Sequence, residues 1–278
     1  MIRPDAIGEL KDGAAGLVAL SELFASRRVG PKAVSIALAP VIEACASVEA
    51  AAQTLERDLL AVAGEHADAA AEIRALFERA VSAVRALATE AGAASRSHVD
   101  ARTRLVLERA AHEACARVAA GLFAGELFAA AAVPRPVTVR VADVLSFGPV
   151  LPEGPQVVRA TLDVPAEPMT TTDARLLRAL VEICVQVVAA SGVGRPHVEV
   201  TAGLPHGVRI RVSAPPRSAA ESPPSAGRPS PTPAGGVLTV RRLPWPDGVR
   251  SLVRAAASMS GATVSIDASG RSAMLELP

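Results

Sequence analysis

The stretch Pro244–Pro278, PWPDGVRSLVRAAASMSGATVSIDASGRSAMLELP, decides the fold of this chain. Asp247 and Gly248 precede an apolar segment whose residues recur at helical spacing. Gly261 ends this segment, and Gly270 then separates two short stretches that alternate as strands do. The sequence therefore predicts a helix and a β-hairpin at the end of a mixed α/β domain.

The segments before this stretch complete the domain, which we place at residues 136–278. Thr170–Asp173 offers N-caps to an apolar helix from about 174 to 190. The patterns also predict a short helix at 139–147 and strands at 156–164, 197–202, 208–214 and 237–242. Residues 215–236 are dense in Pro, Ser, Ala and Gly, and this composition predicts disorder.

The N-terminal half carries apolar residues at helical spacing from about residue 7 to residue 132. The segment 1–31 contains one helix, and a second helix begins near residue 32 and either pauses at Gly64 or runs through it to about 91. Ser97 with Asp100 is similar to a capping box before the next helix. We expect segment 32–135 to form an antiparallel hairpin. Its apolar stripe predicts a homodimer, in which two hairpins make a four-helix bundle.

Composition narrows the class of function. Lys+Arg number 29 against 28 Asp+Glu, and this balance argues against a nucleic-acid or anionic-membrane surface. The three cysteines are far apart in apolar segments, which indicates buried free thiols in a reducing cytosol. No signal peptide and no window of about 18 uncharged apolar residues is evident. No two His or Cys stand at zinc-ligand spacing. We expect a cytoplasmic protein without a metal site.

Three segments carry a resemblance to a known family. The helix from Glu108 to Phe128, the segment Val139–Leu145 and the closing helix and hairpin resemble parts of a histidine kinase, over roughly residues 60 to 278. The resemblance implies a dimerising, phosphotransfer-like hairpin. It also implies an α/β sandwich with a mixed, mostly antiparallel sheet, of the superfamily that includes gyrase and chaperone ATPases. The fold class is then α+β.

In that family, three sequence boxes bind nucleotide. The first places a Mg²⁺-ligating Asn on a helix; here Glu182 keeps the acidic position and Gln186 replaces the Asn. The alternative is that both residues form the solvated face of an amphipathic helix. In the second box Ala214 stands where an Asp would read adenine, and in the third Asp247–Gly248–Val249 replaces a Gly-x-Gly phosphate turn. Ala cannot accept the hydrogen bond, so the protein is not expected to bind ATP or Mg²⁺.

The histidines are candidates for a phosphoacceptor, which the family carries on an exposed helix face. His66 has the spacing most similar to the family's, but Ala67 follows it and Asp68 lies two residues on, where it does not share a helical face. His112 is followed by Glu113, on the later helix, and His98 falls at the loop. For each, an ordinary polar surface position is the alternative.

The resemblance implies a function in two-component signalling. We expect a non-catalytic, histidine-kinase-like protein that docks a receiver domain or a partner kinase on its helices. The alternative is a histidine phosphotransferase that relays a phosphoryl group through His66 or His112 without ATP. An active ATP-dependent kinase requires a substitute for the adenine-reading Asp and is the least favoured of the three.

Overall fold

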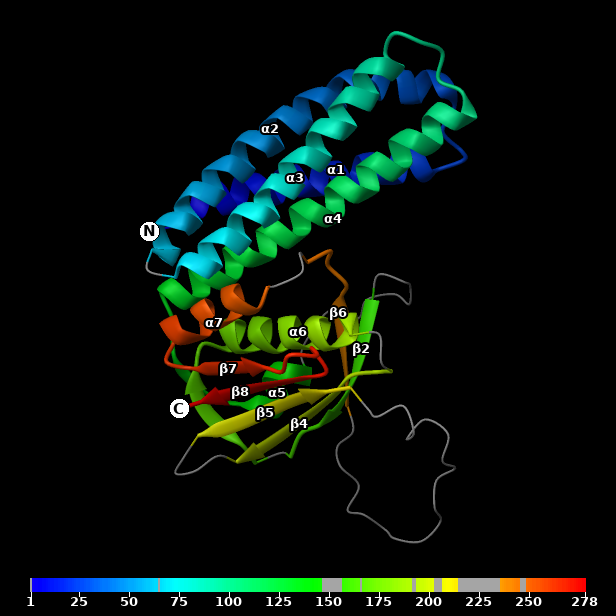
Figure 1. The fold of residues 1–278 in the computed structure, drawn as a ribbon. Helices are drawn as coiled ribbons and strands as arrows, with labels where there is room; N and C mark the ends of the chain where they lie inside the picture. The colour runs from blue at the N-terminus through cyan, green and yellow to red at the C-terminus, as the bar shows by residue number, and fades with distance from the viewer. Residues whose placement is uncertain are drawn as a thin grey trace, which may run out of the picture. The chain divides into compact units, whose positions relative to one another are not determined.

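The computed structural model describes residues 2–64, 66–146, 157–165, 167–191, 194–202, 207–214, 236–245 and 249–278. The fold is α+β, with four helices before a mixed sheet (Figure 1). The chain divides into two compact units. The helical unit comprises Met1–Ala129 with Leu243–Leu252, and the sheet unit comprises Ala130–Arg242 with Val253–Pro278. The predicted disordered segment 215–236 lies outside the described residues except for Gly236, which begins a strand.

The helical unit contains α1 (Pro4–Ala25), α2 (Pro31–Ala63), α3 (Ala67–Ala94) and α4 (Ala101–Ala132). The sequence left open whether one helix runs through Gly64, and the structure separates α2 from α3 there. Gly64 caps α2 with a positive φ of 31°, a conformation that glycine adopts at little cost. The predicted long hairpin helix is therefore two helices.

Close packing of small residues brings these helices together. A Cβ added at Gly125 of α4 would lie 2.8 Å from Leu55 Cδ2 of α2, and one added at Gly121 would lie 3.2 Å from Phe77 of α3. Such short distances mean that glycine is what allows the helices to approach. Phe24, Leu55, Phe77 and Phe128 are fully buried in the resulting core.

The helices of one chain thus supply the apolar surfaces that the sequence assigned to a second copy. The hairpin of α3 and α4 is covered by α2, which contacts both, and Lys11 of α1 lies 4.0 Å from Glu126 of α4. This arrangement covers part of the apolar surface from which a dimeric bundle was expected, while side chains such as Ile36 and Leu105 stay exposed. The homodimer itself stays a prediction.

Arg104 joins the beginning of α4 to the end of α1. Its guanidinium donates to the carbonyl oxygens of Phe24 (2.6 Å), Val29 (2.8 Å), Leu23 (3.3 Å) and Ser26. The last carbonyls of a helix have no partner within the helix, and a cation at this end also complements the helix dipole. One side chain therefore fixes the α1–α2 turn at the same end of the bundle as the α3–α4 loop.

The sheet unit is built on a six-stranded sheet in the order β6-β2-β4-β5-β8-β7. Its strands are β2 (Val157–Asp163), β4 (His197–Ala202), β5 (Val208–Ser213), β6 (Gly236–Arg241), β7 (Thr263–Ile266) and β8 (Ser272–Leu277). β2 and β4 run parallel, and the other neighbours are antiparallel. Helix α6 (Ala174–Ala190) packs on this sheet, against β5, β8, β2 and β6 (Figure 1). A mixed, mostly antiparallel sheet was predicted and is confirmed.

The sequence patterns did not predict two short strands. β1 (Val137–Arg140) pairs antiparallel with β3 (Met169–Thr172), and helix α5 (Val141–Ser146) follows β1 directly. The prediction of a helix over 139–147 was therefore wrong at its start. Four-residue strands carry too little alternation to be recognised, and their pairing is set by residues about 30 positions away in the chain.

The closing hairpin follows the prediction. Helix α7 (Arg250–Met259) ends at Gly261, whose φ is 75°, and β7 and β8 are joined by a turn that contains Gly270 with a φ of 71°. Asp267 organises this turn, because its carboxylate accepts from the Arg271 N–H at 2.9 Å.

By length and composition, α2 and α4 are long and apolar enough to cross a membrane, unlike the sequence expectation that no segment would be. The core helices of a bundle meet the same criteria, but 28% of the apolar window of α2 and 56% of that of α4 are buried in the structure.

Candidate functional site

Helix α6 carries the first candidate box, and an acidic N-cap fixes where this helix begins. The Asp173 carboxylate accepts from the backbone N–H of Arg175 (2.9 Å), Leu176 (3.4 Å) and Arg135 (3.0 Å), and from the Arg175 guanidinium. Asp173 is only 3% exposed. Burial by itself would raise the pKa of Asp173, but the hydrogen bonds from Arg175 and Arg135 outweigh it and leave the pKa below its ordinary value.

Glu182 and Gln186 lie one turn apart on α6 and do not form a solvated face. Gln186 is 4% exposed, and the Glu182 side chain is largely buried. The alternative reading of these residues from the sequence was therefore wrong. The apolar pattern of α6 continues almost around the helix, so that the face carrying these two polar residues is also covered.

The Glu182 carboxylate is already paired. Arg178 Nε donates to Glu182 Oε1 at 2.6 Å, and the same guanidinium donates to the Val144 carbonyl of α5 at 3.2 Å. Burial raises the pKa of Glu182, while Arg178 opposes that effect. A carboxylate held in this way would have to give up its guanidinium before it could ligate a cation.

Ala214, at the position of the adenine-reading Asp, continues the sheet. Its N–H donates to the Arg271 carbonyl at 2.9 Å, one residue beyond the Ser213–Ser272 pair of β5 and β8. The methyl side chain offers no hydrogen-bond acceptor, and two prolines follow it in the sequence. This position contributes only to the β-ladder.

Of the third box, Asp247 and Gly248 lie outside the described residues. Val249 is described and is 4% exposed, just before α7 begins. It belongs with Leu243–Leu252 to the helical unit, whereas Glu182, Gln186 and Ala214 belong to the sheet unit.

The three candidate histidines, His66, His98 and His112, are spread over the helical unit and are not brought together. His66 is the N-cap of α3, exposed in the turn after α2, so it does not sit on a helix face as the phosphoacceptor expectation required. His112 is exposed on α4, but the carboxylate of Glu113 accepts from Arg117 at 2.7 Å. His98 lies in the α3–α4 loop, as expected.

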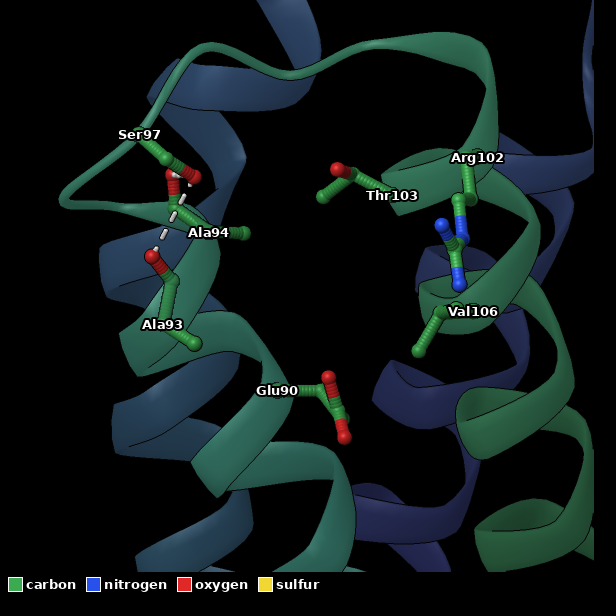
Figure 2. A pocket seen from close by; sticks show the side chains of 7 residues that line it. All are labelled: Glu90, Ala93, Ala94, Ser97, Arg102, Thr103 and Val106. Atoms are coloured by element: carbon green, nitrogen blue, oxygen red, sulfur yellow. Dashed lines mark hydrogen bonds between the residues drawn. The ribbon is translucent and has the colours of Figure 1, made fainter.

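The structure places a hollow where the sequence indicated none. It lies between the end of α3 and the beginning of α4, has a volume of about 190 Å³, and is lined by Glu90, Ala93, Ala94, Ser97, Arg102, Thr103 and Val106 (Figure 2). The α4 side chains face those of α3 across it (Figure 2). A hollow between two helix ends depends on how the helices pack, which no local pattern encodes.

The loop beside this hollow is fixed by two caps. Asp100 accepts from the Thr103 N–H at 2.7 Å and so is itself the N-cap of α4, whereas the expected capping box placed Ser97 there. Ser97, predicted as the other half of that capping box, instead donates to the carbonyls of Ala93 and Ala94 at the end of α3. The loop is therefore held at both of its ends.

Among the described residues, no group of three or more His, Cys, Asp or Glu side chains is arranged to hold a metal ion. No protein-family model matches this chain, and no curated protein matches it.

Proposed function

We propose that this protein is a non-catalytic, histidine-kinase-like regulator of two-component signalling, cytoplasmic, that docks a receiver domain or a kinase on its helical unit and works without ATP. The observation that carries the proposal is that the described nucleotide-box positions, in a mixed and mostly antiparallel sheet, make other contacts. The Ala214 N–H is hydrogen-bonded in the β-ladder, and the Glu182 carboxylate accepts from Arg178 at 2.6 Å. At the described box positions, the adenine-reading acid is absent and the acidic side chain is already paired, and this supports a protein of that family that works without ATP.

The end of the bundle that holds the hollow offers a docking surface. Arg104 ties the α1–α2 turn to the start of α4, so Ile36 near the start of α2 lies at the same end as Leu105 and Val106. Their exposed fractions are 77%, 45% and 38%. Exposed apolar side chains beside a hollow lined by both polar and apolar residues are typical of a protein-binding surface.

The docking proposal is tested with purified receiver domains and kinase cores immobilised for a binding titration. The wild-type chain should bind at least one of them, and Val106→Asp should weaken binding about tenfold or more, because a charge would be buried in the contact. Val133→Asp is the matched control, since Val133 is exposed outside the helical unit. Equal binding by the Val106 and Val133 variants, or no binding to any candidate, would contradict the proposal.

A phosphotransferase is the second candidate, because the His112 side chain is exposed on a helix and Glu113 follows it. Incubation with a phosphorylated receiver domain would then give acid-labile phosphate on this chain, and His112→Ala or His66→Ala would remove it. Absence of label, or label that both substitutions leave intact, excludes those residues as acceptors.

A further inference from the structure

Helix α2 leaves most of its apolar surface uncovered. It is 33 residues long, and only 28% of its most apolar window is buried. Ile36, near the start of α2, is 77% exposed, more than any other large apolar side chain in the described part of the chain. An isoleucine left in water forgoes the free energy that burial of its side chain would supply, so a partner that covers this face gains most there.

The exposed residues of α2 include a stripe whose members follow one another at intervals of three or four. The members of this α2 stripe are Lys32, Ile36, Ala39, Glu43, Ser47 and Ala50. Residues at these intervals lie on one face of a helix. Apart from Ile36 and the two charged residues, the members are small, so a second helix can approach this face closely.

The α2 stripe carries opposite charges at two points. Lys32 and Glu43 are both exposed and lie about three helical turns apart. Neither forms any of the salt bridges found in the described part of the chain. Arg57, farther along α2, already donates to the Gln53 carbonyl at 3.3 Å and to Thr54 Oγ1 at 3.2 Å. Lys32 is therefore the cation of this face that is available to an approaching carboxylate.

The α2 stripe is complementary to an antiparallel copy of itself. When Lys32 of one copy meets Glu43 of the other, the two-fold axis makes the reciprocal ion pair as well. Ile36 of each copy then lies against Ala39 of the other, because the two positions are equally far from the axis. A lipid bilayer is another environment that can cover an apolar helix, but it would have to take up the charge of Glu43 in the middle of the face.

We propose that the outer face of α2 binds a second copy of this chain, through an antiparallel pair of α2 helices with Ile36 near its centre and Lys32–Glu43 ion pairs on both sides. The contact differs from the bundle of two hairpins that the sequence predicted, because α3 and α4 take no part in it. It covers Ile36 and leaves Leu105 and Val106 of α4 exposed for docking. The inference goes beyond the proposed function and does not depend on it.

Self-association of the full-length chain tests the proposal. A contact between one pair of helices is small, so we expect a micromolar dissociation constant in sedimentation velocity runs from about 1 to 200 µM. Ile36→Asp should weaken the dimer at least about tenfold, because a charge would be buried in the contact. Val133→Asp is the matched control and should associate as the wild type does, since Val133 is exposed outside the helical unit.

A charge exchange tests the antiparallel arrangement. Lys32→Glu and Glu43→Lys should each weaken the dimer about fivefold, because like charges then meet on both sides of the axis. The double variant restores both ion pairs with their signs exchanged and should return to within about twofold of the wild type. Both residues are exposed, so this series decides if Ile36→Asp loses the circular dichroism of the wild type.

Three results would overturn the proposal in these runs. They are a chain that stays monomeric over the whole range, a dimer that Ile36→Asp and Val133→Asp affect equally, and a double charge variant no tighter than the single ones. Vesicles of phosphatidylcholine and phosphatidylglycerol probe the other way to cover α2. Cosedimentation of the wild type with them, lost in Ile36→Asp, would assign this face to a membrane and overturn the contact between copies.

Discussion

Helices α6 and α7 both begin at an acidic side chain, but the two acids come from very different places in the chain. Asp173 immediately precedes α6 and accepts from amides two and three residues ahead. Glu72 lies in another helix and reaches amides 179 and 180 residues away. The same physical need, partners for the free N–H groups of a helix start, is met once by local sequence and once by packing. Only the first solution is visible before the fold is known.

The largest effect should come from Asp173→Ala. The carboxylate is buried and accepts from three backbone N–H groups, so its removal leaves buried donors without a partner. We expect a loss of about 2–3 kcal/mol in the free energy of unfolding, measured by urea denaturation. Glu167→Ala, an exposed acid nearby, serves as the control and should change it by less than about 0.5 kcal/mol. A similarly small change for Asp173→Ala would contradict the claim that the Asp173 cap stabilises α6.

Glu72→Ala should cost less, about 1–2 kcal/mol, because this carboxylate is only half-buried and accepts from two backbone N–H groups rather than three. The same denaturation experiment checks it, with Glu78→Ala, which removes an exposed acid from the same helix, as the control. A loss greater than that of Asp173→Ala would show that the distant cap outweighs the local one.

Conservative substitutions sharpen the difference further. Asp173→Asn keeps an acceptor oxygen at the cap and should cost only about 1 kcal/mol. Glu72→Asp shortens the side chain by one methylene, and across a helix–helix distance the carboxylate then no longer reaches both amides. We expect Glu72→Asp to lose nearly as much stability as Glu72→Ala, whereas a near-wild-type result would mean that α3 can move to follow it.

The pH dependence of the two caps should have opposite signs. The pKa of Asp173 is lowered by folding, so its contribution is present above the ordinary Asp value and is lost as pH falls through the folded pKa. The pKa of Glu72 is raised, so the folded state binds this proton more tightly and the group favours folding more as pH falls toward the ordinary Glu value. The difference in the free energy of unfolding between the wild type and Asp173→Asn should therefore decrease on acidification. The same difference between the wild type and Glu72→Gln should increase. Equal slopes for the two pairs would contradict the assignments.

The sequence could predict the elements that depend on local interactions, but not those that depend on residues distant in the chain. The helix Ala174–Ala190 with its Asp173 cap, the strands at 197–202 and 208–213 and the closing hairpin with Gly261 and Gly270 all depend on residues within a few positions. The four-residue strands β1 and β3 depend on each other instead. The Glu182–Arg178 ion pair could have been read as an i, i+4 pair on one helix, but the burial of Gln186 could not.

The absence of nucleotide chemistry is the central claim, and titration of the wild-type protein with MgATP tests it most directly. A ligand at about 100 times its dissociation constant would stabilise the folded state by roughly 2.7 kcal/mol, which a thermal melt detects readily. We expect the melting midpoint to stay the same from zero to millimolar MgATP. A midpoint that rises steadily with MgATP concentration would show that the sheet unit still binds nucleotide, and would contradict the account.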